Sequence, residues 1–178
     1  TAATETCAGG VAVRDETAGQ SAVRGGPGIG HRCDDGSVID VLIAYTQAAR
    51  VAAGGTTAIL AQINLAIANA NTVFSNSLID VELRLVHTVE VTYAETGDWQ
   101  IDGPRLVNPA DGFVDVVHTL RDQYGADCVS LWVQNLNPGG IGYFPHPSRS
   151  GIGASGFSML RLSNAAALTF AHEIGHNL

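Results

Sequence analysis

Two histidines and a glutamate near the end of the given sequence could bind a metal ion and use it. His172-Glu173-Ile174-Gly175-His176 is an HExxH sequence. On a helix, the two histidines lie one turn apart on the same face and can direct imidazole nitrogens at one ion. Zn²⁺ accepts such nitrogens at about 2.0–2.1 Å. Glu173 could then act as general base toward a metal-bound water.

The residues around this motif predict the helix that would position it. The stretch from Ala165 to Leu168 favours helix, and Ser163 or Asn164 can serve as its N-cap. Apolar residues recur every four positions and would bind the helix to a core: Phe170, Ile174 and Leu178.

An amphipathic helix whose two histidines merely share a solvent-facing stripe would contain the same five residues. The metal-binding interpretation is favoured because the helix is apolar, carries no competing charges and follows a predicted sheet.

The stretch FAHEIGHNL, from Phe170 to Leu178, resembles the zinc helix of the metzincin metallopeptidases, especially the reprolysin-like (adamalysin-type) branch. The signature of that family is HExxHxxGxxH, followed by a methionine turn. The resemblance implies that His172 and His176 are zinc ligands and Glu173 the catalytic base. The given sequence stops at Leu178, before the expected glycine, so we expect a truncated domain that lacks the third histidine.

The chain is expected to consist of an N-terminal segment and one catalytic domain. Residues 1–36 are rich in glycine, alanine, threonine and arginine without sustained periodicity, which suggests a propeptide remnant or an N-terminal arm. Residues 37–178 resemble the N-terminal subdomain of a metzincin, with the C-terminal subdomain missing.

Apolar runs predict an α/β fold, called α+β in some schemes. Strands are expected at 38–45, 81–91, 126–133 and 156–162, and a short edge strand at 141–144. Long helices are expected from 56 to 74 and from 111 to 124, with a loop at 98–111. This order predicts a mixed, mostly parallel twisted sheet with an antiparallel edge strand, two long helices and the zinc-binding helix.

The short edge strand could take part in substrate binding. In metzincins the corresponding strand lines the cleft and pairs antiparallel with extended substrate, so the resemblance implies that role for Gly140, Ile141, Gly142 and Tyr143. An ordinary covered edge is the alternative, and the two interpretations are evenly balanced.

The chain has three cysteines. Cys7 and Cys33 can form a disulfide across the glycine-rich leader. Alternatively, Cys7 is a latency thiolate that occupies the open zinc position, as propeptide cysteines do in some metzincins. Cys128 lies in an apolar run and is expected to be a buried small hydrophobe.

Other histidines and carboxylates are expected to be structural or exposed rather than metal ligands. His87 lies in a predicted strand, and His146 stands between two prolines in a loop. Asp115, His118 and Asp122 share one face of a predicted helix, where such groups are common at the surface.

Composition narrows the classes of partner. The net charge is −8 and the sequence contains no lysine, which argues against binding to nucleic acid or anionic membranes. No apolar run approaches the roughly 20 residues of a membrane span, so none is expected. This composition is compatible with a secreted, extracellular protein. The resemblance implies a polypeptide substrate, and we expect a monomer. Calcium is possible but nothing indicates it.

The intact protein is predicted to be a zinc metalloendopeptidase, similar to bacterial secreted members of the family that include peptidyl-Asp metallopeptidases. Two alternatives stay open at this point. One is a catalytically inert truncated domain or binding module, and the other is a thermolysin-like zinc peptidase.

Overall fold

The computed structural model describes residues 38–143, 156–166 and 168–178. The chain divides into two units, residues 1–34 and residues 35–178, and every described element lies in the second. The predictions for residues 1–36, Cys7, Cys33 and His146 fall outside the described residues.

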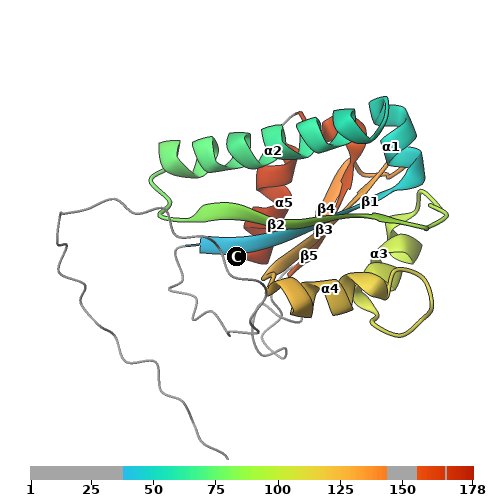
Figure 1. The fold of residues 1–178 in the computed structure, drawn as a ribbon. Coiled ribbons are helices and arrows are strands. Elements are labelled where there is room, and N and C mark those ends of the chain that lie inside the picture. The colour runs from blue at the N-terminus through green and yellow to red at the C-terminus, as the bar shows by residue number, and fades with distance from the viewer. Residues whose placement is uncertain (1–37, 144–155, 167) are drawn as a thin grey trace, which may run out of the picture. The chain divides into compact units, whose positions relative to one another are not determined.

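A five-stranded sheet in the order β2-β1-β3-β5-β4 organises the second unit (Figure 1). Its strands are β1 (Val38–Thr46), β2 (Glu82–Val91), β3 (Cys128–Val133), β4 (Gly140–Gly142) and β5 (Phe157–Arg161). All neighbouring pairs are parallel except β4 with β5, which is antiparallel. The predicted mostly parallel sheet with one antiparallel edge strand is confirmed.

Helices cover both faces of this sheet. They are α1 (Gln47–Ala53), α2 (Thr56–Asn76), α3 (Trp99–Val107), α4 (Val116–Tyr124) and α5 (Thr169–Asn177). Helices α2 and α5 share one hydrophobic cluster on the first face, and α3 and α4 share another on the second (Figure 1). The strand β1 is buried on both faces because successive side chains point to opposite clusters.

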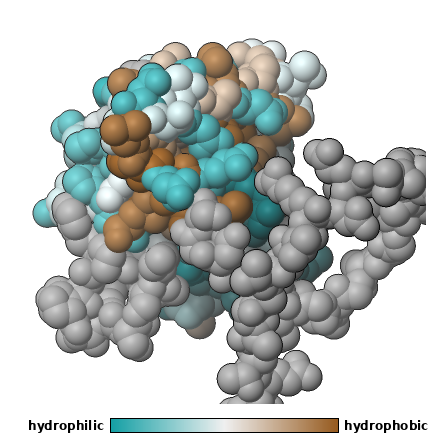
Figure 2. Space-filling model, turned by 90° about the vertical axis from the view of Figure 1, so that its left-hand side faces the viewer, coloured by the Kyte–Doolittle hydropathy of each residue, from teal (hydrophilic) through white to brown (hydrophobic). Residues whose placement is uncertain are grey.

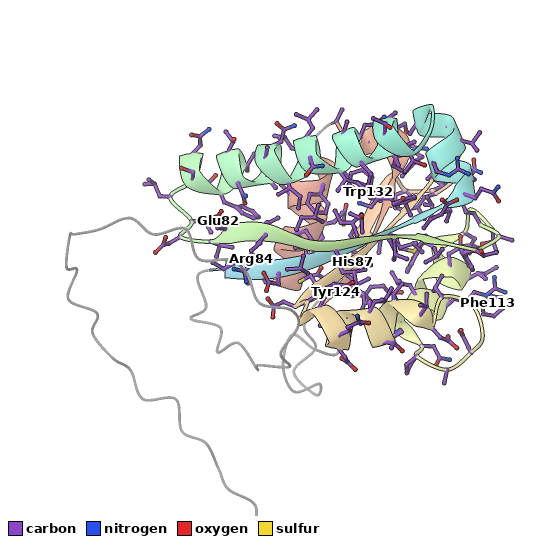
Figure 3. The ribbon with its side chains drawn as sticks, viewed as in Figure 1. Glu82, Arg84, His87, Phe113, Tyr124 and Trp132 are labelled. Atoms are coloured by element: carbon purple, nitrogen blue, oxygen red, sulfur yellow. The ribbon has the colours of Figure 1, made fainter. Side chains whose placement is uncertain are left out.

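The central strand β3 shows the same division of side chains. Trp132 belongs to the cluster with α2 and α5, whereas Val129 and Val133 belong to the cluster with α3 and α4. Figure 3 shows Trp132 on the α2 side of the sheet and Tyr124 on the α4 side. Tyr124 stacks on His87 of β2, with ring centroids 4.0 Å apart. This contact gives His87 the structural role expected of it.

Helix α2 is longer and more apolar than the sequence analysis expected of any segment. With 21 residues and a mean hydropathy of 1.2, α2 is long and apolar enough to span a membrane by these two measures alone. One of its faces is nevertheless buried in the core: Ile59, Ile63, Ala66, Ala70 and Phe74. Packing against the sheet therefore accounts for the apolar character of this face.

The turn after α2 leaves apolar side chains at the surface. Leu78 is 93% exposed and Ile79 is 45% exposed, beside the beginnings of β1 and β2. Figure 2, which views this end of the second unit, shows apolar surface among hydrophilic side chains. The described residues leave this apolar surface uncovered.

The prediction of a loop at 98–111 was wrong, because α3 occupies most of it. Gly103 and Pro104 suggested a loop, but tertiary contacts of Asp102 stabilise the helix. The Asp102 side chain is fully buried and accepts hydrogen bonds from the hydroxyl of Tyr93 and from Thr96 and Gly97. Asp98 caps the helix by accepting from the Gln100 N–H.

Helix α4 begins later than its sequence suggested. Asp111 was predicted to cap it, but the helix starts at Val116. The Asp111 carboxylate accepts instead from the Phe113 N–H, and the Asp115 carboxylate accepts from Gly112. These bonds form a turn ahead of the helix. Gly125 ends the helix in the left-handed conformation, as expected.

Replacing Asp102 by Asn should destabilise the protein by about 3 kcal/mol, because buried donors would then face an amide group. Urea unfolding followed by tryptophan fluorescence measures this change. Asp122→Asn, at an exposed position of α4, is the control and should stay within about 0.5 kcal/mol of the wild type. Equal unfolding midpoints for all three proteins would contradict the anchoring role of Asp102.

The Cys128 thiol should be unreactive in the native protein. It is fully buried, and burial raises the pKa of the thiol to about 12. In a background with Cys7→Ser and Cys33→Ser, a chromogenic disulfide reagent at pH 8 should label no thiol until denaturant is added. Rapid labelling of the native protein would contradict the burial of Cys128.

Candidate active site

Helix α5 holds the HExxH motif but begins at Thr169, four residues later than predicted. Neither proposed N-cap residue caps it. Leu162–Asn164 forms a short 3-10 helix, and the Asn164 carboxamide accepts hydrogen bonds from Arg161 Nε and the Ser163 hydroxyl. The Asn164 side chain therefore bonds to residues that precede α5 and does not cap this helix.

The apolar stripe anchors α5 as predicted at two of its three positions. Phe170 and Ile174 are buried, and the Phe170 ring meets the Trp132 ring of β3 edge-on, with centroids 6.0 Å apart. Leu178 is 46% exposed, so the stripe does not continue to the end of the helix.

The two histidines lie side by side on the face of α5 that points away from this core. Their ring centroids are 4.5 Å apart and the ring planes are 79° apart. Two nitrogens that share a tetrahedral ion at about 2.0–2.1 Å lie roughly 3.3 Å from each other, which rings at this separation can provide. His172 is exposed and His176 half-buried, so an ion can reach them.

Glu173 lies between the helix and the edge strand. Its side chain is only 6% exposed, and the Gly142 N–H donates a hydrogen bond to its carboxylate. Burial raises the pKa of Glu173, while His172, His176 and the Gly142 N–H oppose this shift. The carboxylate is therefore held close to the two imidazoles in a partly desolvated position, as a general base requires.

Glycines in β4 allow this close approach. A Cβ at Gly140 would overlap the Glu173 carboxylate and the Thr169 methyl group. A Cβ at Gly142 would overlap the backbone carbonyl of Glu173 and the His176 Cβ. The two glycines face α5 together because residues two apart in a strand share a face.

Asn177 connects the end of α5 to the backbone at β4 and β5 through hydrogen bonds. The sequence analysis did not predict this role. The Asn177 side chain is fully buried, and its Nδ2 donates to the carbonyls of Tyr143 and Phe157. An asparagine immediately after the motif was the only signal, and it does not reveal its partners. The backbone next to β4 is thus hydrogen-bonded to the helix that carries the motif.

The other predicted residues of the edge strand lie on the opposite face or beyond the strand. Ile141 pairs with Met159, and Tyr143 follows the last residue of β4. The Tyr143 hydroxyl lies against Gly103 of α3. Within the part of the chain that the structure describes, β4 pairs only with β5. Peptide binding along its other edge stays a prediction.

The structure does not assemble the other candidate metal groups. His118 Nε2 lies 3.0 Å from the Leu106 carbonyl and its ring meets that of Phe157, so His118 packs between α3 and the sheet. Across residues 38–143, 156–166 and 168–178, no group of three or more His, Cys, Asp or Glu side chains is arranged to hold a metal. The described residues therefore contribute two imidazoles to a metal site.

Residues 60–178 match the model of the metallopeptidase family M12B, reprolysin-like. The chain belongs to this reprolysin-like family. Because membership places it among the metzincins, the thermolysin-like alternative is removed. Membership also implies a metal cofactor.

Several curated relatives of this reprolysin-like chain are named peptidyl-Asp metalloendopeptidase. The protein of Stenotrophomonas maltophilia is 34% identical over 144 residues, which cover 79% of this chain and 32% of the relative. The protein of Xanthomonas campestris pv. campestris is 35% identical with the same coverage, and that of Pseudomonas aeruginosa is 34% identical over 153 residues, 24% of its length. The chain thus spans about a third or less of these relatives.

A solved structure has a similar fold. It is described as a chaperone-substrate complex and matches with a TM-score of 0.62 at 18% identity, over 79% of this chain and 25% of the other. At this level of identity the match supports the fold alone.

Gly142→Ala should separate the edge strand from α5, because the added methyl group would meet backbone rather than a flexible side chain. We expect a loss of about 1–3 kcal/mol in stability and weaker metal binding, measured by thermal unfolding and metal titration. Gly175→Ala, on the facing helix α5, is the control, because a Cβ there meets nothing within 4 Å. A Gly142→Ala protein as stable as this control would contradict the close packing.

Proposed function

We propose that the whole protein is a zinc-dependent metalloendopeptidase and that this chain supplies two zinc ligands and the general base. The observation that carries the proposal is the arrangement of α5, where two imidazoles 4.5 Å apart flank a buried glutamate. Family membership and the metalloendopeptidase names of the relatives support it.

Each residue has a defined task in this proposal. His172 and His176 would hold the ion, which would supply Lewis-acid chemistry at the scissile carbonyl. The Glu173 carboxylate would take a proton from the attacking water and pass it to the leaving amine. Because the Gly142 N–H donates to this carboxylate, the base keeps its orientation while it exchanges the proton.

The substrate is proposed to be a polypeptide that binds in extended form along β4. Among the described residues no further strand lies beside the outer edge of β4, and a peptide can add there as a further strand. Cleavage next to aspartate is proposed from the names of the relatives, which are called peptidyl-Asp metalloendopeptidases. Secretion remains a prediction from composition.

Replacing Glu173 by Gln in the full-length protein should leave the metal bound and lower kcat by at least about 100-fold, because the general base is lost. Metal analysis and cleavage of a fluorogenic peptide measure the two effects. Glu90→Gln is the control and should retain full activity, because this exposed carboxylate of β2 pairs with Arg50 of α1. His172→Ala should lose the metal. Cleavage retained by Glu173→Gln would refute the role of Glu173.

A further inference from the structure

The connecting segment between β3 and β4, residues 134–139, leads directly to the candidate active site. It is irregular apart from an isolated bridge between Asn137 and Asp98. The next residue, Gly140, begins β4 and lies against the Glu173 carboxylate. Because β4 consists of only three residues, the hydrogen bonds that hold the connecting segment help to set the position of this strand.

The half-buried Glu95 side chain holds the beginning of the connecting segment. Its Oε1 accepts a hydrogen bond from the Gln134 N–H at 2.9 Å, and its Oε2 accepts from the Asn135 N–H at 2.8 Å. The Asn135 side-chain amide also donates to Oε2, at 3.3 Å. Two consecutive backbone N–H groups thus use both oxygens of one carboxylate, and bonds to a charged acceptor are stronger than neutral ones.

Glu95 is itself fixed to the end of β1. The Thr46 hydroxyl donates to Glu95 Oε1, and Thr46 is the fully buried last residue of β1. The same hydroxyl oxygen accepts from the Ala49 N–H, which caps α1. Since β1 pairs with both β2 and β3, Glu95 connects the irregular segment to a central strand of the sheet.

The residues that follow Glu95 hold the connecting segment further along. The Asn137 N–H donates to the Gly97 carbonyl at 3.3 Å, and the Gly97 N–H donates to the buried Asp102 carboxylate at 3.1 Å. At the other end of the segment, the Gly139 carbonyl accepts from the Arg161 N–H of β5 at 2.9 Å. Glu95 therefore begins a series of contacts that ends where β4 meets the proposed base.

Helix α5 has anchors of its own, which do not involve the connecting segment. Phe170 and Ile174 are buried in the core, and Asn177 donates to two backbone carbonyls next to β4 and β5. A change at Glu95 should therefore affect the placement of β4 more than that of the helix with the metal ligands and the base.

We propose that Glu95 is a positioning residue for substrate binding. By holding Gln134 and Asn135, its carboxylate keeps β4 in place, so that the outer edge of this strand can accept an extended peptide beside Glu173. Glu95 does not touch the substrate itself. Without it, part of the binding energy would be used to order the strand, which weakens binding. This inference rests on the proposed peptidase function and adds a residue to it.

The test compares Glu95→Gln with the wild type in the full-length protein, using a long and a short fluorogenic peptide. The long peptide can pair along β4, and the short one keeps only the residues that flank the cleaved bond. An amide has one acceptor oxygen, so Glu95→Gln loses one of the two backbone bonds. KM for the long peptide should rise about 10-fold, with kcat within about threefold and kcat/KM for the short peptide within about twofold.

Glu90→Gln is the matched control, because it makes the same chemical change in an exposed carboxylate whose bonds go to the Arg50 side chain. It should keep the wild-type values for both peptides. Glu95→Asp keeps both acceptor oxygens on a shorter side chain. It should show the pattern of Glu95→Gln with a smaller change, and it serves as the test if Glu95→Gln does not fold.

Hydrogen exchange followed by mass spectrometry gives a second measurement, which needs no activity. Glu95→Gln should exchange faster than the wild type at residues 134–142 and at the wild-type rate in α5 and β2. Unchanged exchange at residues 134–142, or faster exchange throughout the domain, overturns the positioning role.

The kinetic outcomes separate this inference from the proposed function. An unchanged KM for the long peptide, or an equal loss for both peptides, overturns the positioning role of Glu95. A wild type that binds the long peptide no more tightly than the short one also overturns it, and leaves the peptidase proposal standing. A wild type that cleaves no peptide overturns the peptidase proposal and the positioning role with it.

Discussion

The close contact between β4 and α5 is the constraint on which the candidate site depends. No side chain of β4 stands between strand and helix at Gly140 and Gly142, so the Glu173 carboxylate can reach the Gly142 N–H while remaining buried. Asn177 ties the end of the helix to the backbone at Tyr143 and Phe157. The same contact thus fixes the base, the two imidazoles and the strand edge proposed to bind substrate.

Local pattern was enough to predict the sheet and the motif. The apolar run of β1 predicted a strand buried on both faces, and the HExxH spacing predicted two imidazoles on one side of a helix, both of which the structure has. These features depend on residues close together in the sequence. Glycines in the edge strand were visible as well, but their contact with α5 joins residues about 30 positions apart.

Features that depend on distant partners were missed. Gly103 and Pro104 gave a local signal for a loop, and only the burial of Asp102 against the loop from Tyr93 to Gly97 makes α3 favourable. Ser163 and Asn164 are good capping residues by type, but Asn164 is held by Arg161. Residue type alone could not show that Asp102 anchors a helix or that Asn164 bonds to Arg161 instead of capping α5, because each role depends on a neighbour that the fold supplies.

The most direct test of the account is the X-ray absorption spectrum of the zinc-loaded full-length protein at the zinc K-edge. The spectrum should show nitrogen neighbours at about 2.0–2.1 Å with outer-shell scattering from imidazole, unchanged in Glu173→Gln, whereas His176→Ala, like His172→Ala, should hold no zinc. A zinc shell without imidazole scattering, or one that changes when Glu173 is replaced, would contradict the assignment of two histidine ligands beside a base that does not bind the metal.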